Sequence, residues 1–245
     1  MPERLEGGNM NAVKLDSGNV LRDAGPWSPS VHALLDHLRS EGVQGIPLPL
    51  ELDVERGRER LSYLDGHVPQ FPLPTWVWRE SVLTSGAQLL RTLHDASESF
   101  STAGRTWQQP TREPAEVVCH NDFAPHNLVF DDGHQLVGVI DWDMCSPGPR
   151  LHDLAVFATR AVPLTVDLPA DGPSAADLRA RIQTVLDAYR SEATIDELLA
   201  SAASGLRFLA DHSRAAAARL DKPDLAVHAR LYERDATAIE SGRLV

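Results

Sequence analysis

The chain has 245 residues, of which 42% are hydrophobic and 24% charged, so it is long and apolar enough to fold around a sizeable core. Its formal net charge of −12 disfavours nucleic acid as a partner, because phosphate binding requires clustered lysine and arginine. No apolar run approaches membrane-spanning length and the N-terminus lacks a signal-peptide pattern, so we expect a cytoplasmic protein with no membrane partner. In that compartment Cys119 and Cys145 are expected to be free thiols.

The beginning of the chain carries strand and turn signals. A glycine-containing turn over residues 6–13 leads into a first strand, and residues 19–22 are predicted to be the next strand. Residues 48–54 and 60–64 are predicted to form two more strands, joined by a turn at 55–58. We therefore expect a small antiparallel sheet near the N-terminus.

Two amphipathic helices are predicted in the first half of the chain. Ser28 as the N-cap and Pro29 at the first helical position begin the first helix, and Gly42 ends it. Residues 82–93 have the apolar spacing of the second helix. At its end His94 is expected to be a packed or capping residue without a chemical role.

A predicted hairpin near the middle of the chain gathers polar side chains. Residues 128–130 and 136–140 form its strands, and Gly133 in the turn is able to take a positive φ. The two ends of a hairpin lie side by side, so residues just before the first strand and just after the second face one small site. The polar residues gathered in this way are Asp122, Asn127 and Asp141.

Two carboxylates and a carboxamide oxygen are hard ligands, which suit Mg²⁺ and can also accept a hydroxyl proton. The spacing from His120 to Asp122 and Asn127, with Asp141 on the next strand, matches the catalytic loop and metal-binding Asp of kinases. In kinases the first Asp accepts the proton of the attacking hydroxyl, and the Asn and the later Asp hold Mg²⁺ against nucleotide phosphates. A zinc site of His120, Asp122 and His126 is an alternative that leaves Asn127 and Asp141 without a role.

These motifs, with His120-Asn121-Asp122 and Asp141-Trp142-Asp143 in place of the protein-kinase forms, resemble the aminoglycoside phosphotransferase family. Relatives in that family act on choline, homoserine and fructosamine. The resemblance implies an α+β, two-lobed, protein-kinase-like fold. A small β-rich N-terminal lobe would span residues 1–65, and a larger, mainly helical C-terminal lobe would span residues 66–245. It also implies Asp122 as the catalytic base, Asn127 and Asp141 as metal ligands, and Mg²⁺ as the cofactor.

The resemblance further implies which residues of the small lobe bind the nucleotide. A glycine-containing loop would cover the phosphates, and a hinge segment would receive the purine. The residues implied are Gly7, Gly8 and Asn11 in the loop and Ser62, Tyr63 and Leu64 in the hinge.

Arg22 stands where the resembling fold carries a lysine that holds the α- and β-phosphates, and Lys14 is the competing candidate. Arginine can hold phosphate through a forked pair of N–H groups, although its shape differs from that of lysine. The usual lysine pairs with a glutamate near the start of the following helix, but Val31 and His32 occupy that region here. The Lys–Glu pair is therefore expected to be missing or replaced.

Helices are expected to fill the rest of the chain. Thr194 and Glu197 form a capping box before a long alanine-rich helix, and a last helix runs from about Pro223. In the resembling family such helices cover the substrate. Asp153 would be a structural acid that supports the catalytic loop, and His120 would hold that loop by packing and hydrogen bonding.

The favoured function is transfer of the γ-phosphoryl group of ATP or GTP to a hydroxyl of a small molecule. The partners would be a nucleoside triphosphate and an acceptor such as an aminoglycoside or another cationic amino-alcohol, with which the negative net charge is compatible. A kinase-fold protein that binds a nucleotide or ligand without turnover is the alternative, favoured by arginine in place of lysine. A metallohydrolase is a third reading, which rests on the His and Asp cluster alone.

Overall fold

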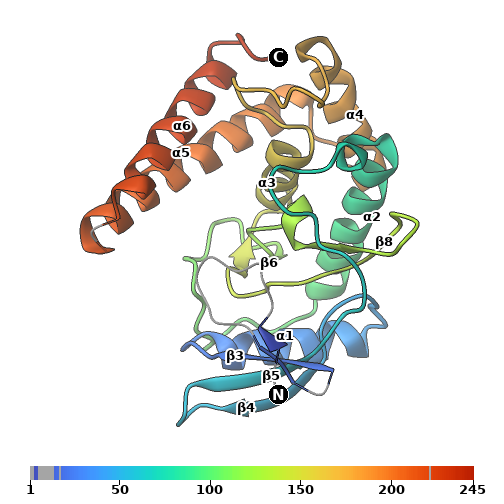
Figure 1. Ribbon diagram of the computed structural model, residues 1–245, viewed down its shortest axis with the longest axis vertical. Helices are drawn as coiled ribbons and strands as arrows, with labels where there is room; N and C mark the ends of the chain where they lie inside the picture. Colours follow the sequence, from blue (N-terminus) through green and yellow to red (C-terminus); the bar gives the residue numbers. More distant parts are fainter. Residues whose placement is uncertain (1–2, 5–13, 17, 221) are drawn as a thin grey trace. The chain divides into compact units, whose positions relative to one another are not determined.

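The computed structural model describes residues 3–4, 14–16, 18–220 and 222–245. The chain divides into two compact units. The first consists of Met1–Pro74 and Leu89–Arg150, and the second of Thr75–Gln88 and Leu151–Val245. Figure 1 labels the helices and several of the strands.

The first unit contains a five-stranded sheet in which every neighbouring pair of strands is antiparallel. The order across the sheet is β1-β2-β3-β5-β4, so β3 lies beside β5 although a helix and β4 separate them in the sequence. The described strands are β1 (Glu3–Arg4), β2 (Lys14–Asp16), β3 (Asn19–Asp23), β4 (Pro49–Asp53) and β5 (Arg58–Ser62). The predicted N-terminal sheet is confirmed, but its last strand begins and ends two residues earlier than the pattern indicated.

Helix α1 (Ser28–Ser40) presents one apolar face to the interior of the first unit, and Val31, Leu34 and Leu38 are buried there. Gly42 follows the helix with a φ of +87°. This is the left-handed conformation that glycine adopts most easily, which is why glycine is common at helix ends. The prediction of Ser28 as the N-cap was wrong by one position. Trp27 holds that position, because the Ser28 hydroxyl turns back and accepts a hydrogen bond from the Gly25 amide at 3.0 Å.

Two short antiparallel pairs complete the first unit: β6 (Val117–Cys119) with β9 (Ser146–Gly148), and β7 (Leu128–Phe130) with β8 (Leu136–Val139). The predicted hairpin is thus confirmed. Its turn differs from the prediction, since His134 takes the positive φ of 58°, and Gly133 does not. The Asp131 carboxylate accepts hydrogen bonds from the Gly133 amide at 2.9 Å and the Gln135 amide at 2.8 Å, and these bonds fix the turn in its observed form.

Helix α2 (Glu80–Ser97), preceded by a 3-10 helix (Thr75–Trp78), begins in the second unit and ends in the first. Helix α3 (Arg150–Ala161), a 3-10 helix (Ala175–Asp177), and helices α4 (Leu178–Tyr189), α5 (Ile195–Leu220) and α6 (Pro223–Glu240) follow. Helices α5 and α6 lie side by side in Figure 1. The capping box predicted before α5 is confirmed, because the Thr194 amide donates to the Glu197 carboxylate at 2.7 Å and the Thr194 hydroxyl accepts from the Glu197 amide at 3.2 Å.

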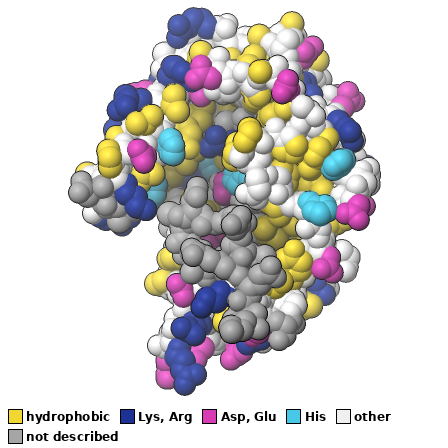
Figure 2. All heavy atoms as spheres, viewed as in Figure 1, with side chains coloured by type: hydrophobic (Ala, Val, Ile, Leu, Met, Phe, Trp, Pro, Cys, Tyr) yellow, Lys and Arg dark blue, Asp and Glu magenta, His cyan; other side chains and the backbone are white. Residues whose placement is uncertain are grey.

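Over the described part of the chain, no helix combines the length and the apolarity that crossing a bilayer requires. Both cysteines are buried thiols that form no disulfide, as expected. Acidic and basic side chains are interspersed on the face seen in Figure 2.

Candidate functional site

Asn127 is fixed by hydrogen bonds to the loop that precedes it. It lies at the end of a 3-10 helix (Pro125–Asn127) just before β7 and is 5% exposed. Its Nδ2 donates one hydrogen to the backbone oxygen of Asp122 and the other to Asp122 Oδ2, each at 2.8 Å. Since both amide hydrogens are used, the orientation of the amide is determined and Oδ1 is left as an acceptor.

The two ends of the β7–β8 hairpin meet as the sequence predicted. The Ile140 amide donates to the backbone oxygen of Asn127 at 2.9 Å, which places Asp141 one residue from this bond. Asp141 has a φ of +64°, a conformation that is costly for a residue with a Cβ, and its side chain is 52% exposed. The fold thus holds an accessible carboxylate in a strained backbone position beside Asn127.

The carboxylate of Asp122 receives its described hydrogen bonds at one oxygen. Oδ2 accepts from Asn127 and lies 3.5 Å from His126 Nε2. Burial raises the pKa of Asp122, but the hydrogen bond and charge of His126 and the hydrogen bond of Asn127 outweigh burial and bring the pKa below its usual value. Asp122 therefore stays ionised at neutral pH.

His120 has the structural role that the sequence indicated. Its Nδ1 accepts a hydrogen bond from the Asp122 amide at 3.3 Å, and its Nε2 donates to the backbone oxygen of Ile140 at 3.1 Å. The buried ring also contacts Phe123 and Trp142. Because both ring nitrogens serve the backbone, His120 has no lone pair for zinc, and this geometry argues against the zinc alternative.

Arg22 on β3 is 8% exposed and meets three carboxylates. Its Nε donates to Glu59 Oε1 at 2.7 Å, its Nη2 donates to Asp143 Oδ1 at 2.6 Å, and its Nη1 lies 3.5 Å from Asp141 Oδ1. Glu59 is also 2.7 Å from His32 Nε2 on α1. The glutamate that the sequence analysis sought on α1 is thus replaced by a glutamate on β5, and α1 contributes a histidine to it.

The acids around Arg22 respond differently to their surroundings. Burial raises the pKa of Glu59, but the hydrogen bond from His32 and the charge of Arg22 outweigh it and lower that pKa overall. Burial also raises the pKa of Asp143; Arg22 opposes this rise, Asp141 and Glu59 add to it, and the pKa stays above its usual value. Burial disfavours the charge of Arg22, yet Asp143, Glu59 and Asp141 raise its pKa overall. Negative charge is therefore in excess around Asp141 and Asp143, where a cation would relieve it.

The remaining predicted nucleotide-binding residues either lie at the end of β5 or fall outside the described residues. Gly7, Gly8 and Asn11 lie outside the described residues. The Ser62 amide donates to the backbone oxygen of Leu48 at 2.8 Å, and the Ser62 hydroxyl accepts from the Leu48 amide at 2.8 Å. This residue is therefore tied to the neighbouring chain segment. Tyr63 and Leu64 follow the end of β5 and are half-buried, and the side chain of Lys14 on β2 is exposed.

Glu59 was not among the site residues predicted from the sequence, and Asp143 appeared there only as part of a motif. Glu59 is 1% exposed, and Leu61, two positions later on the same face of β5, is 6% exposed. Glu59 therefore lies on the inward face of the strand. A charged residue at an inward position of a strand is a signal that could have been found, because buried charges are normally paired. Its partner Arg22 was not predictable in this way, since the two residues are 37 positions apart.

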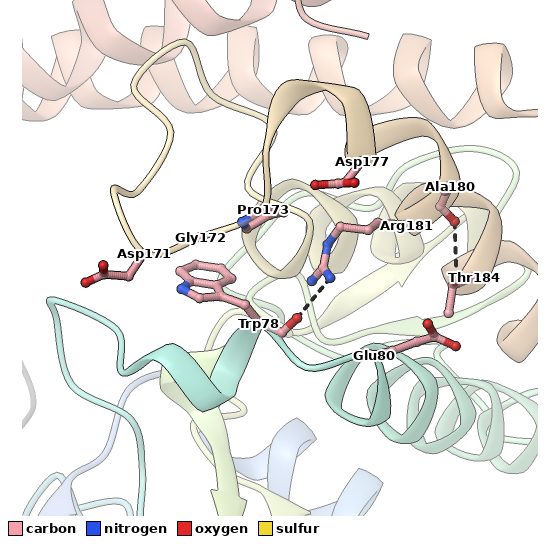
Figure 3. A pocket seen from close by; sticks show the side chains of 9 residues that line it. All are labelled: Trp78, Glu80, Asp171, Gly172, Pro173, Asp177, Ala180, Arg181 and Thr184. Atoms are coloured by element: carbon pink, nitrogen blue, oxygen red, sulfur yellow. Dashed lines mark hydrogen bonds between the residues drawn. The ribbon is translucent and has the colours of Figure 1, made fainter.

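A cavity of about 420 Å³ lies in the second unit, and none of the predicted site residues lines it (Figure 3). Arg181 reaches across it and donates to the backbone oxygens of Trp78 at 2.9 Å and Ala161 at 3.3 Å. Burial lowers the pKa of Arg181, and Asp177 and Glu80 only partly offset the effect. We interpret Arg181 as a structural residue that satisfies carbonyl groups at two helix ends.

Comparison with known proteins confirms the resemblance predicted from the motifs. Residues 69–190 match the model described as the phosphotransferase enzyme family (APH). The chain is 36% identical over 149 residues to the trifolitoxin immunity protein of Rhizobium leguminosarum bv. trifolii. The matched region covers 58% of this chain and 55% of that protein. The chain thus spans about half the length of the curated relative that it matches.

Solved structures share the fold over nearly the whole chain. A choline/ethanolamine kinase family protein from Mesorhizobium loti has a TM-score of 0.67 at 18% identity, with 98% of this chain and 87% of that chain covered. The GDP complex of wild-type aminoglycoside 2'-phosphotransferase-IIIa has a TM-score of 0.70 at 13% identity, with 97% of this chain and 92% of that chain covered. Amicoumacin kinase in complex with AMP-PNP, Ca²⁺ and Ami has a TM-score of 0.69 at 12% identity, with 98% of this chain and 88% of that chain covered. The predicted α+β, kinase-like fold is confirmed, with a small β-sheet part and a larger helical part.

Proposed function

We propose that this chain, whose residues 69–190 match the phosphotransferase enzyme family, transfers the γ-phosphoryl group of ATP or GTP to a hydroxyl of a small molecule. The observation that carries the proposal is the arrangement of Asn127. Its amide hydrogens both go to Asp122, so its oxygen is free for a cation at the hairpin end where Asp141 also stands. A candidate base and two candidate metal ligands thus share one small site.

The donor set fits Mg²⁺. Asn127 Oδ1 and the Asp141 carboxylate are the hard oxygen ligands that this ion prefers, and they would hold it in our proposal. The acids Glu59, Asp141 and Asp143 outnumber the single guanidinium of Arg22, so a divalent cation would balance the local charge. When bound, Mg²⁺ supplies neutralisation of the phosphate charge.

The chain's own residues would position the reactants. Asp122 is ionised and turns Oδ2 towards Asn127, which leaves Oδ1 to orient the acceptor hydroxyl and to take its proton late in a loose transition state. Arg22 would hold the nucleotide phosphates, with Gly7, Gly8 and Asn11 as a covering loop. Ser62, Tyr63 and Leu64 would form the purine hinge, with the backbone groups beyond Ser62 as the better candidates, because Ser62 is already hydrogen-bonded to Leu48. In this proposal the boundary between the two lobes lies near residue 65, and the protein works in the cytoplasm.

The acceptor is proposed by class. Solved structures of similar fold include a choline/ethanolamine kinase family protein, an ethanolamine kinase and an aminoglycoside 2'-phosphotransferase. These names support a small amino-alcohol or aminoglycoside. The curated relative is named an immunity protein for trifolitoxin, which adds toxins to the acceptors that merit testing.

Product formation with Mg²⁺ tests the function. The chain would be incubated with ATP or GTP and with panels of amino-alcohols, aminoglycosides and toxins, and phosphorylated acceptor would be detected by mass spectrometry. We expect transfer with Mg²⁺ and none with Zn²⁺ alone. Mg²⁺-dependent nucleotide binding without transfer or hydrolysis would favour the alternative, a kinase-fold binding protein. Hydrolysis that requires Zn²⁺ would contradict both.

A further inference from the structure

Arg22 lies between acids that come from distant parts of the sequence. Glu59 is 37 positions away on β5, and Asp143 is 121 positions away, after β8. The Glu59 side chain is 1% exposed and that of Asp143 is 11% exposed, so both contacts are shielded from water. Shielded charge-assisted hydrogen bonds of 2.6 and 2.7 Å hold the guanidinium far more firmly than a surface ion pair would.

The contacts use different nitrogens of the guanidinium. Nε donates to Glu59 and Nη2 donates to Asp143, so each acid has a donor nitrogen of its own. Nη1 points to Asp141, whose carboxylate is half exposed, at a distance of 3.5 Å. A lysine ammonium would have to serve these acids from one nitrogen, whereas a guanidinium spreads its donors over a fixed fork. The two acids thus give a physical reason for arginine at a position where the kinase fold has lysine.

We propose that Glu59 and Asp143 are positioning residues of the nucleotide site and together form a clamp on Arg22. The clamp uses Nε and Nη2 and leaves the hydrogens of Nη1 to face the same phosphate–metal unit as Asp141. It also ties the segment that carries Asp141 to the sheet, because Asp143 follows Asp141 by two residues. This inference rests on the proposed function, since it explains how that site is assembled.

His32 extends the clamp to helix α1. Its Nε2 is 2.7 Å from Glu59 Oε2, the oxygen that Arg22 does not use. Each oxygen of the Glu59 carboxylate therefore has one partner, and the rotation of the carboxylate is fixed. In the usual kinase arrangement this helix supplies the glutamate itself. Here α1 supplies His32, which orients a glutamate from the sheet.

A double-mutant cycle on nucleotide affinity tests the clamp. The dissociation constant of a Mg²⁺-bound, non-hydrolysable ATP or GTP analogue is measured by calorimetry for the parent, Glu59→Gln, Asp143→Asn, Arg22→Ala and each double variant with Arg22→Ala. We expect each acid variant to weaken binding about 10–100-fold, the range for residues that orient a ligand-binding group. In the Arg22→Ala background the same acid changes should alter affinity less than about threefold, because the group they position is absent.

Two further variants sharpen the test. Arg22→Lys keeps the positive charge but not the fork, and it should restore little of the affinity that Arg22→Ala loses. Glu51→Gln is the matched control, since Glu51 faces Arg60 on the same sheet at 3.6 Å and its side chain is 67% exposed. This control should bind the analogue like the parent. Thermal unfolding of every variant identifies any that does not fold, and the other arm of the clamp then carries the test.

The outcomes separate the clamp from the proposed function. If the parent binds no Mg²⁺–nucleotide, the proposed function fails. If the parent binds it but the acid variants bind equally well, or lose as much affinity without Arg22 as with it, the clamp is wrong while the proposed function stands. Full affinity in Arg22→Lys would likewise overturn the argument that the site requires a fork.

Discussion

Asn127 and Asp122 are joined by two hydrogen bonds of 2.8 Å, one to the backbone oxygen and one to Oδ2. Both bonds come from the same amide nitrogen, so the amide of Asn127 and the carboxylate of Asp122 orient each other. A change at either residue therefore disturbs the other.

Asp141→Ala removes a candidate metal ligand on the exposed side of the site. We expect this variant to lose Mg²⁺-dependent nucleotide binding and to keep its fold, because the side chain is half exposed and its one contact with the described residues, to Arg22, is long. Calorimetric titration of nucleotide with and without Mg²⁺ measures the effect. Asp132→Ala, in the turn of the same hairpin and with a 99% exposed side chain, is the control. An unchanged Mg²⁺ dependence in Asp141→Ala would rule out this assignment.

Asp122→Asn keeps the shape of the proposed base and removes its charge. We predict nearly normal binding of nucleotide and Mg²⁺ but a loss of transfer of about two orders of magnitude or more, the range that a positioned base supplies. Single-turnover transfer to an identified acceptor is the measurement. Turnover close to the parent rate would show that Asp122 is not the base.

Arg22→Ala should weaken nucleotide binding more than Lys14→Ala does. Arg22 is buried beside the proposed metal ligand Asp141, whereas the Lys14 side chain is exposed on β2. We expect about a tenfold or larger loss for Arg22→Ala, the worth of a hydrogen bond to a charged group. The reverse order of the two affinities would transfer the phosphate-binding role to Lys14.

Gly86→Ala should destabilise the second unit. A Cβ at Gly86 in α2 would lie 2.4 Å from the Phe157 ring, and Phe157 is completely buried in α3. We expect a loss of about 1–3 kcal/mol in the free energy of unfolding, typical of an overpacked core. Gly205→Ala in α5 is the matched control, because the nearest atom to its Cβ outside the backbone of its own helix is 4.0 Å away. That variant should be as stable as the parent or gain up to about 1 kcal/mol from helix propensity, as measured by urea unfolding.

Glu197→Gln should lower the melting temperature at pH 7. Hydrogen bonds from the Thr194 amide and hydroxyl lower the pKa of Glu197 in the folded chain. A carboxyl with a lowered folded pKa adds stability above its unfolded pKa and loses that contribution as the pH falls through its folded pKa. The difference between parent and variant should therefore shrink below about pH 4, under the ordinary range for glutamate. A melting-temperature difference that stays constant from pH 7 to pH 3 would contradict this account.

The local part of the site could be predicted from the sequence. Asp122, Asn127 and Asp141 lie within 20 positions of one another, on one hairpin whose strands and turn have short-range signals. The spacing of such a hairpin determines which residues meet at its end, whatever the rest of the chain does. The same is true of the capping box at Thr194 and Glu197, where all the partners are within one helical turn.

The environment of Arg22 was decided by the tertiary structure alone. The sequence placed Arg22 on a strand, and the sheet order then put β5 and its Glu59 beside it. Asp143 reaches the same guanidinium from the segment after β8, across 121 positions. Periodicity and turn chemistry describe only near neighbours, whereas a buried ion pair depends on which distant segments pack together, and that choice is made by the burial of the whole core.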